Sequence, residues 1–206
     1  MGGERSERRH GTMTGEALDL LFRRRSIKRL VEPGPTDDEL HAMLRAAAAA
    51  PDHGELRPWK FVVLRGADKD AFGEVLADAY LRRVANEGAE SVPAVLEKER
   101  TKLGRAPLVI VVAAVHRHHD KITWDDQVGS AYAAAQNLCL AATALGFGSM
   151  WRTGKPTSDP NVKRALGVGD HDAVVAFVYI GTIPPDSAKE PHDPSLDGIV
   201  VEWTPG

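Results

Sequence analysis

Two uninterrupted apolar segments constrain the fold of this chain more than any other feature. They are PLVIVVAAV at residues 107–115 and AVVAFVYIG at residues 173–181. Both are far shorter than the roughly 20 residues of a membrane-spanning helix. A strand with one face in water alternates apolar and polar residues, and neither segment does so. They therefore predict central strands of a sheet that is covered on both faces.

Helical patterns precede these strands. Apolar residues recur at the spacing of one helical face from Thr14 to about Arg24. Thr36 with Glu39 forms a capping box, which predicts a second helix that stops before Pro51.

The middle of the chain alternates between strand and helix patterns. KFVVLR at residues 60–65 is typical of a short strand, and residues 68–86 have the pattern of an amphipathic helix. The charged segment 87–105 is expected to be part helix and part mobile cover. An alanine-rich helix over 125–145 ends at Gly146, and because it lacks a strongly polar face we expect it to be buried on most sides.

Length, charge and cysteine content exclude several classes of protein. With 206 residues, one domain over residues 14–206 is expected, preceded by a flexible arm at 1–13 that lacks the apolar core of a secretory signal. The formal net charge of -3 argues against a protein that wraps nucleic acid. The one cysteine, Cys139, cannot form an internal disulfide, and its apolar neighbours predict burial in a protein of the reducing cytoplasm.

A cluster of cations follows the first predicted helix. RRRSIKRL at residues 23–30 collects five positive charges within seven positions. Because two prolines follow shortly, residues 26–32 should be extended, and alternate side chains would share a face. Arg24, Ser26 and Lys28 would then form an anion site suited to a phosphate monoester. The alternative is a basic helix end that complements the helix dipole, and the segment taken alone favours that alternative.

Two histidine-containing segments are candidates for chemistry. In APDHGELRPW, residues 50–59, His53 fits a ligand contact and a turn residue equally well, while Trp59 is expected to plug the core. HRHHD at residues 116–120 follows a core strand. Its adjacent histidines diverge in direction and no second ligand cluster accompanies them, so we expect no metal site.

A glycine-rich segment offers a surface for a flat ligand. GFGSMWRTGKP, residues 146–156, permits close backbone approach and supplies Trp151 and Arg152 as a stacking surface and a cation. It is not a Walker A loop, because the spacing between its glycines is too long and a proline follows the lysine. GVGDHD at residues 167–172 lacks the third glycine of a dinucleotide-binding motif.

Taken together, five motifs in this order and spacing resemble the nitroreductase family, most closely its short, single-domain members. The resemblance runs from about Thr14 to Ile183. It rests on RRRSIKRL, APDHGELRPWKFVVL, RAPLVIVVAA, the alanine-rich helix ending in GFGSMWRTG, and VKRALGVGDHDAVVAFVYIG. It implies an α+β fold with a mainly antiparallel central sheet covered by helices on both faces, and a homodimer with flavin mononucleotide (FMN) at its interface.

The resemblance also assigns roles to the cation cluster. By likeness, Arg24, Arg25 and Ser26 contact the ribityl phosphate of FMN and nearby flavin atoms, and Lys28 lies beside the pyrimidine edge of the ring. Two-electron reduction leaves negative charge on that edge, which a fixed cation stabilises.

Further roles follow for the two loops. His53 is expected to contact the flavin of the partner subunit. Trp151, Arg152 and Thr153 are expected to border the ring as a loop that supplies backbone amides and the Arg152 charge. The sequence departs from the family pattern at Arg57, where relatives often carry Asn or Gln.

The implied activity is an FMN-dependent oxidoreduction. Hydride passes from NADH or NADPH to flavin N5, and the electrons then pass to a flat acceptor such as a nitro-aromatic or a quinone in a ping-pong cycle. No side chain need act as catalytic acid or base. Segment 79–105 is expected to cover the ring face and select the acceptor, and Ala49, where some relatives have a larger basic residue, is expected to weaken phosphate binding or open the pocket.

Two other functions compete with this one. A flavin-binding protein that stores or senses FMN would be yellow but would not be reduced by NADPH. A module that binds nucleic acid or an acidic partner through its arginines would be colourless.

Overall fold

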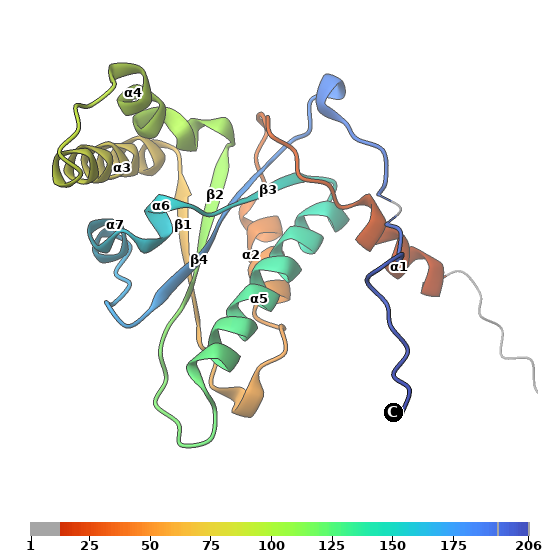
Figure 1. Cartoon of the computed structure of the whole chain (residues 1–206). Helices are drawn as coiled ribbons and strands as arrows, with labels where there is room; N and C mark the ends of the chain where they lie inside the picture. The colour runs from red at the N-terminus through yellow and green to blue at the C-terminus, as the bar shows by residue number, and fades with distance from the viewer. Residues whose placement is uncertain (1–12, 193, 206) are drawn as a thin grey trace, which may run out of the picture.

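The computed structural model describes residues 13–192 and 194–205 of the chain (Figure 1). These residues form one antiparallel sheet of four strands in the order β1-β2-β4-β3. The strands are β1 (Trp59–Arg65), β2 (Leu108–Ala114), β3 (Gly148–Arg152) and β4 (Ala173–Gly181). The predicted fold class is therefore confirmed. Residues 1–12 of the predicted arm at 1–13 lie outside the described residues.

The two apolar segments are the central strands β2 and β4, as predicted. Every residue of β2 is buried, and so is every residue of β4 after Ala173. Successive side chains alternate between two hydrophobic cores, one on each face of the sheet. From β2, Leu108 and Ile110 enter one core, while Val109 and Val111 enter the other.

Helices cover both faces (Figure 1). One face is covered by α2 (Asp37–Ala47) and α5 (Trp124–Ala144). The opposite face is covered by α3 (Ala67–Asn86), the 3-10 turn η2 (Lys102–Arg105) and α7 (Pro160–Ala165). The remaining short elements are α1 (Met13–Arg23), η1 (His53–Glu55), α4 (Pro93–Thr101), α6 (Lys155–Ser158) and η3 (Pro185–Ser187). Among the described residues, no helix combines the length and the apolar character that a membrane crossing requires.

Local sequence explains where the two helices of the α5 face begin and end. Thr36 and Glu39 form the predicted capping box, in which Glu39 accepts the Thr36 N–H at 2.8 Å and Thr36 Oγ1 accepts the Glu39 N–H. Thr123 and Asp126 make the same arrangement at the start of α5. Gly146 follows the end of α5 with a positive φ of 85°, a conformation that glycine adopts readily.

Strand β3 was not predicted from the sequence. Residues 151–153 were expected to form a loop, but Gly148 to Arg152 pair with β4 as an edge strand. A Cβ atom at the first position would lie 2.6 Å from Leu30 Cδ2 and 2.7 Å from Ile183 Cγ1, so any residue other than glycine would force these side chains to move. The glycine therefore permits close packing of the strand and does not form a turn.

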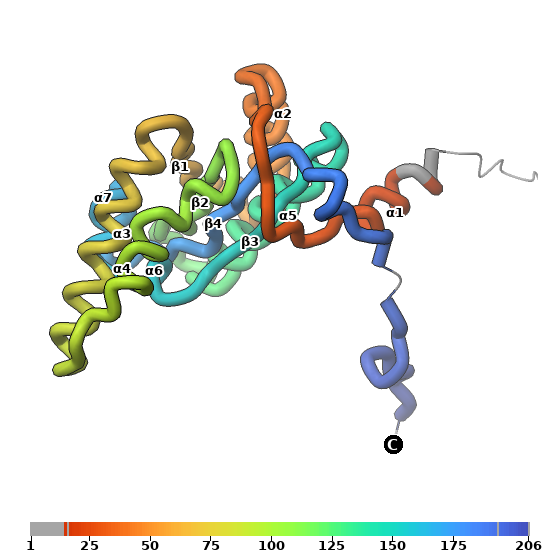
Figure 2. The backbone as a smooth tube through the Cα atoms, turned by 90° about the horizontal axis from the view of Figure 1, so that it is seen from above, coloured from red at the N-terminus to blue at the C-terminus, as the bar shows by residue number. Residues whose placement is uncertain are grey.

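Two helices are less covered than predicted. The apolar stripe of α1 (Leu18, Leu21 and Phe22) is exposed, and α1 lies away from the sheet in both views (Figures 1 and 2). Helix α5 was expected to be buried on most sides, and most of its residues are buried or partly buried, but Tyr132 is 47% exposed. The α1 stripe is apolar and is not covered by the described residues of this chain, whereas the exposed face of α5 around Tyr132 also carries Asp125, Gly129 and Gln136.

Gly73 sets the distance between α3 and α4. A Cβ atom at this position would lie 2.1 Å from the backbone oxygen of Arg100. Alanine in place of a helical glycine ordinarily stabilises a protein by up to about 1 kcal/mol. Here we expect Gly73→Ala to lower the free energy of unfolding by about 1–3 kcal/mol, because α4 must move away. Urea denaturation measures this change.

The exposed residue Ala71 on the same helix provides the calibration. Ala71→Gly should cost about 1 kcal/mol through helix propensity alone. A gain in stability for Gly73→Ala would contradict the close α3–α4 contact.

Candidate functional site

The predicted extended segment after α1 forms a ribbon, defined here as residues 24–31, that lies beside β3. Ile27 donates its N–H to Ser149 O at 3.0 Å, and Val31 donates to Thr182 O at 3.0 Å. Ile27 is 2% exposed and belongs to the core on the α3 face, whereas Ser26 and Lys28 on either side of it are exposed. Burial of Ile27, together with Leu30 at 4% exposure, thus fixes the ribbon and leaves Ser26 and Lys28 facing outward.

A segment from the end of the chain contacts the ribbon. The Arg25 guanidinium donates to Glu190 O, and Arg29 pairs with Asp186 at 3.1 Å. Lys189 donates from Nζ to Ser26 O at 2.8 Å. Lys189 therefore adds a cation at Ser26 that the sequence analysis missed, because no local motif marks a residue 163 positions away.

Arg24 lies on the α5 side of the ribbon. Burial raises the pKa of the Cys139 thiol on α5, and the positive charge of Arg24 opposes that rise. Cys139 itself is buried, as the sequence predicted.

Lys28 and Arg152 come together at one hollow of about 440 Å³, within the size range of small-molecule sites. Arg29 of the ribbon and Arg105 of η2 complete its basic lining. A second hollow of about 240 Å³ shares Arg105 and Arg152 and adds Thr153. Three of the predicted residues, Lys28, Arg152 and Thr153, therefore line two adjoining hollows, and Arg105 is a further cation that sequence reasoning missed.

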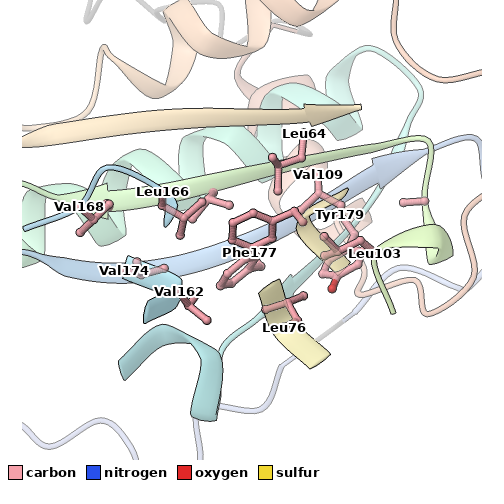
Figure 3. Close-up of a cluster of buried hydrophobic side chains, with 14 of the residues drawn as sticks. Leu64, Leu76, Leu103, Val109, Val162, Leu166, Val168, Val174, Phe177 and Tyr179 are labelled. Atoms are coloured by element: carbon pink, nitrogen blue, oxygen red, sulfur yellow. The ribbon is translucent and has the colours of Figure 1, made fainter. Parts of the chain in front are cut away.

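Tyr179 of β4 forms part of the floor of the second hollow, beside Leu103 in the buried cluster of Figure 3. The guanidinium of Arg152 lies 5.8 Å from the centre of its ring. Burial raises the pKa of Tyr179 to about 12, although the charges of Arg152 and Arg105 oppose the rise. The phenol is therefore protonated at neutral pH and can donate a hydrogen bond.

Trp151 points to the other face of the sheet. It stacks on Tyr132 of α5, with ring centres 5.9 Å apart and an angle of 20° between the planes. Trp151 and Arg152 were expected to form one surface, but they are adjacent residues of a strand, so their side chains point to opposite faces. The expectation that WRT is a loop is wrong for Trp151 and Arg152, while Thr153 follows the strand.

His53 lies far from the ribbon within one chain. Its loop is at the N-terminal end of α5, where the charge of His53 helps to lower the pKa of Asp126, after the larger effect of hydrogen bonds from Thr123. Arg24 lies near Cys139, which is 13 residues further along α5 than Asp126. At 1.5 Å per residue, Asp126 and Cys139 are about 20 Å apart along the helix. Figure 1 shows the two regions at opposite ends of this helix.

The loop that carries His53 has an unusual backbone. Glu55 and Arg57 adopt positive φ values of 53° and 47°, which residues other than glycine rarely adopt. Asp52 accepts the Arg57 N–H at 2.6 Å and holds this geometry. Such strain concentrates at functional segments. Trp59, expected in the core, is only half-buried at the start of β1.

The HRHHD segment forms hydrogen bonds that hold a loop. His116 donates its backbone N–H to Asp172, and His119 Nδ1 accepts the N–H groups of Lys121 and Ile122 at 3.1 Å each. In the part of the chain that the structure describes, no three side chains of His, Cys, Asp or Glu converge as metal ligands would.

Comparison with known proteins identifies the family. The profile described as "Nitroreductase family" matches residues 21–182. YdjA of Escherichia coli strain K12, assigned by name as an NAD(P)H nitroreductase, is 38% identical over 167 residues, which are 81% of this chain and 88% of YdjA. The chain belongs to the nitroreductase family.

Solved structures of nitroreductases agree with this fold. A nitroreductase-like family protein from Bacillus cereus superimposes with a TM-score of 0.72 at 21% identity, over 92% of this chain and 96% of the other. A nitroreductase with bound FMN from Bacteroides fragilis gives a TM-score of 0.68 at 24% identity, over 92% and 99%. The family expected from five motifs is confirmed.

The raised pKa of Tyr179 predicts a loss of stability at alkaline pH. A tyrosine in the unfolded chain releases its proton near pH 10, whereas Tyr179 in the folded protein keeps its proton up to a pH of about 12. The free energy of unfolding should therefore fall by about 1.4 kcal/mol per pH unit between these values. Urea denaturation from about pH 9 to pH 12 measures the slope.

Tyr179→Phe removes this contribution and should flatten the slope. Cys139, whose pKa burial also raises, contributes in the same direction in both proteins and cancels in the comparison. Parallel curves for the two proteins would contradict the burial of the Tyr179 hydroxyl.

Proposed function

We propose that this protein is an FMN-dependent oxidoreductase that uses NADH or NADPH to reduce a flat acceptor such as a nitro-aromatic or a quinone. One observation carries the proposal: the ribbon turns Ser26 and Lys28 outward, and Lys28 joins Arg105 and Arg152 at one hollow beside the edge strand β3. The oxidoreductase class is that of the family. The FMN bound to the related Bacteroides fragilis and Desulfovibrio desulfuricans proteins supports the choice of cofactor.

The residues present fit FMN in order along the ribbon. Arg24, Arg25 and Ser26 bind the phosphate end, assisted by Lys189, which already contacts Ser26. Arg25 uses one N–H on Glu190 O and retains other donors. Lys28 follows Ser26 by two extended residues, roughly 7 Å, and lies toward the ring end.

The remaining residues position and polarise the ring. When bound, FMN would supply the redox chemistry between the nicotinamide and the acceptor. Lys28 and Arg152 place positive charge where reduction leaves negative charge. Edge strand β3 offers backbone amides near Thr153, while Trp151 braces the strand against α5. No side chain of this set acts as catalytic acid or base.

A second copy of the chain completes the site in this proposal. His53 lies about 20 Å along α5 from Arg24, so it reaches a flavin only on a partner subunit. Within the residues that the structure describes, the α1 stripe and the tail at residues 194–205 expose apolar side chains that a partner would cover. In the tail, Val201 and Trp203 are 88% and 84% exposed, and Figure 2 shows the tail extending away from the sheet.

The visible spectrum tests the cofactor and the function together. Purified protein should be yellow, and anaerobic NADPH should bleach it. Arg24→Glu should weaken FMN binding by about 10- to 100-fold, since it removes charge-assisted hydrogen bonds to the phosphate. Flavin titration measures the dissociation constant.

Arg23→Glu is the matched control, because Arg23 ends α1 and pairs with Asp19 outside the ribbon. It should leave flavin affinity within about twofold of the wild type. Full flavin retention by Arg24→Glu would refute the phosphate assignment. A yellow protein that NADPH does not bleach would be a flavin-storage or flavin-sensing protein instead.

Substitutions in the tail test the second copy. The double variant Val201→Asp, Trp203→Asp should raise the monomer fraction in sedimentation velocity, because it places charge in the proposed apolar interface. Flavin content should fall with the loss of dimer, since each site draws on both chains. Glu202→Gln, between the two positions, is the control. A dimer unaffected by the double variant, or a monomer that retains its flavin, would argue against the shared site.

A further inference from the structure

The second hollow has a strongly one-sided charge. It lies between α3, α4, η2 and the end of β3. Its charged lining consists of six cations and one carboxylate: Arg83, Lys98, Lys102, Arg105, Arg152, Lys155 and Glu99. The whole chain carries a formal charge of -3, so this concentration is local.

Much of that positive charge is not neutralised by the protein. Glu99 pairs with Lys102, and Lys155 lies 3.8 Å from Glu87. Arg83 lies over the ring of Tyr80, 5.4 Å from its centre, and not against a carboxylate. Within residues 13–192 and 194–205, Lys98 and Arg105 also form no ion pair.

The floor of the hollow has a different chemistry from its rim. Phe177 and Tyr179 form the floor, and both belong to the buried core on the α3 face (Figure 3). An aromatic floor accepts a flat ring, and the Tyr179 hydroxyl can donate a hydrogen bond. Cations at the rim attract a carboxylate or phosphate and raise its local concentration.

The hollow also adjoins the proposed flavin site. It shares Arg105 and Arg152 with the hollow at Lys28. A molecule held there would lie next to the ring, where electron transfer takes place. The position of α4 and η2 is fixed by Arg100, which pairs with Glu74 of α3 at 2.8 Å, and by the buried Leu103. The rim is therefore built into the fold.

We propose that this hollow selects flat molecules that carry an anionic group. The molecule is either an acceptor with an aromatic carboxylate or NADPH, which carries an extra phosphate. The inference rests on the proposed function and specifies its substrate class. Arg83 and Lys98 attract the anionic group, and Phe177 and Tyr179 receive the ring.

Steady-state kinetics with matched acceptors tests the acceptor as the source of the anion. Para-nitrobenzoate and para-nitrobenzamide differ in charge but hardly in shape. The double variant Arg83→Gln, Lys98→Gln should lower kcat/KM for the benzoate by about 10-fold and for the benzamide by less than about twofold. Raised salt should reduce the wild-type preference for the benzoate.

Stopped-flow reduction tests the donor as the source. If the anion is the phosphate of NADPH, the same double variant should lower the ratio of NADPH to NADH efficiency by about 10-fold. Two further variants sharpen the result. Arg82→Gln removes an adjacent cation that pairs with Asp78 outside the hollow and should change neither ratio. Glu99→Gln frees Lys102 and should raise the preference for the anionic partner.

Each outcome decides the inference. A loss of charge preference in the double variant but not in Arg82→Gln supports the inference. The assay in which the loss occurs identifies whether the acceptor or NADPH carries the anion. Equal losses for charged and neutral partners, or no change, overturn the inference. A weaker flavin affinity in the double variant would assign these cations to the FMN phosphate, overturning this inference while leaving the oxidoreductase proposal intact.

If the protein binds no flavin, the proposed function fails separately. Equilibrium dialysis of para-nitrobenzoate then measures the hollow directly. Binding that weakens in the double variant but not in Arg82→Gln supports an anion site, and equal binding by all variants overturns it.

Discussion

The antiparallel pairing of β2 with β4 is the interaction on which the rest of the structure depends. Both strands are apolar on both faces, so the sheet is stable only when helices cover each side. Alternation of side chains divides the interior into two cores, one under α5 and one under α3. The outer edge of β4 then receives β3, and β3 receives the ribbon through Ile27. The cations of the ribbon reach their place at the edge of the sheet because Ile27 and Leu30 of the ribbon are buried beneath them.

The candidate site is assembled from segments that are far apart in the sequence. The ribbon, η2, β3 and residues 186–190 meet at one edge, and each supplies basic side chains. Like charges brought together repel one another, so such a cluster persists where the fold holds it rigidly or where an anion binds. Rigid support is visible here, because Ile27, Leu30 and Leu103 are buried beneath the cations. The anion is what the proposed cofactor and substrate supply.

The same architecture separates the two halves of the proposed site. Helix α5 carries the ribbon near its C-terminal end and the strained His53 loop near its N-terminal end. One chain cannot bring these ends together, because a helix of this length is a rigid spacer. In the proposed dimer, the second copy covers the exposed apolar side chains of α1 and of the tail. Flavin binding and dimer formation are therefore expected to depend on each other.

The sequence by itself determined the central strands, the capping box at the start of α2, the extended ribbon and the family. These features depend on local periodicity and on short motifs, which are properties of neighbouring residues. Only the tertiary structure decided that GSMWR is an edge strand, that Trp151 and Arg152 face opposite sides, and that Lys189 and Arg105 join the cation cluster. It also decided that the apolar stripe of α1 is left uncovered. In each of these cases the deciding contact is with a residue far along the chain, or is missing from this chain, and no local pattern records it.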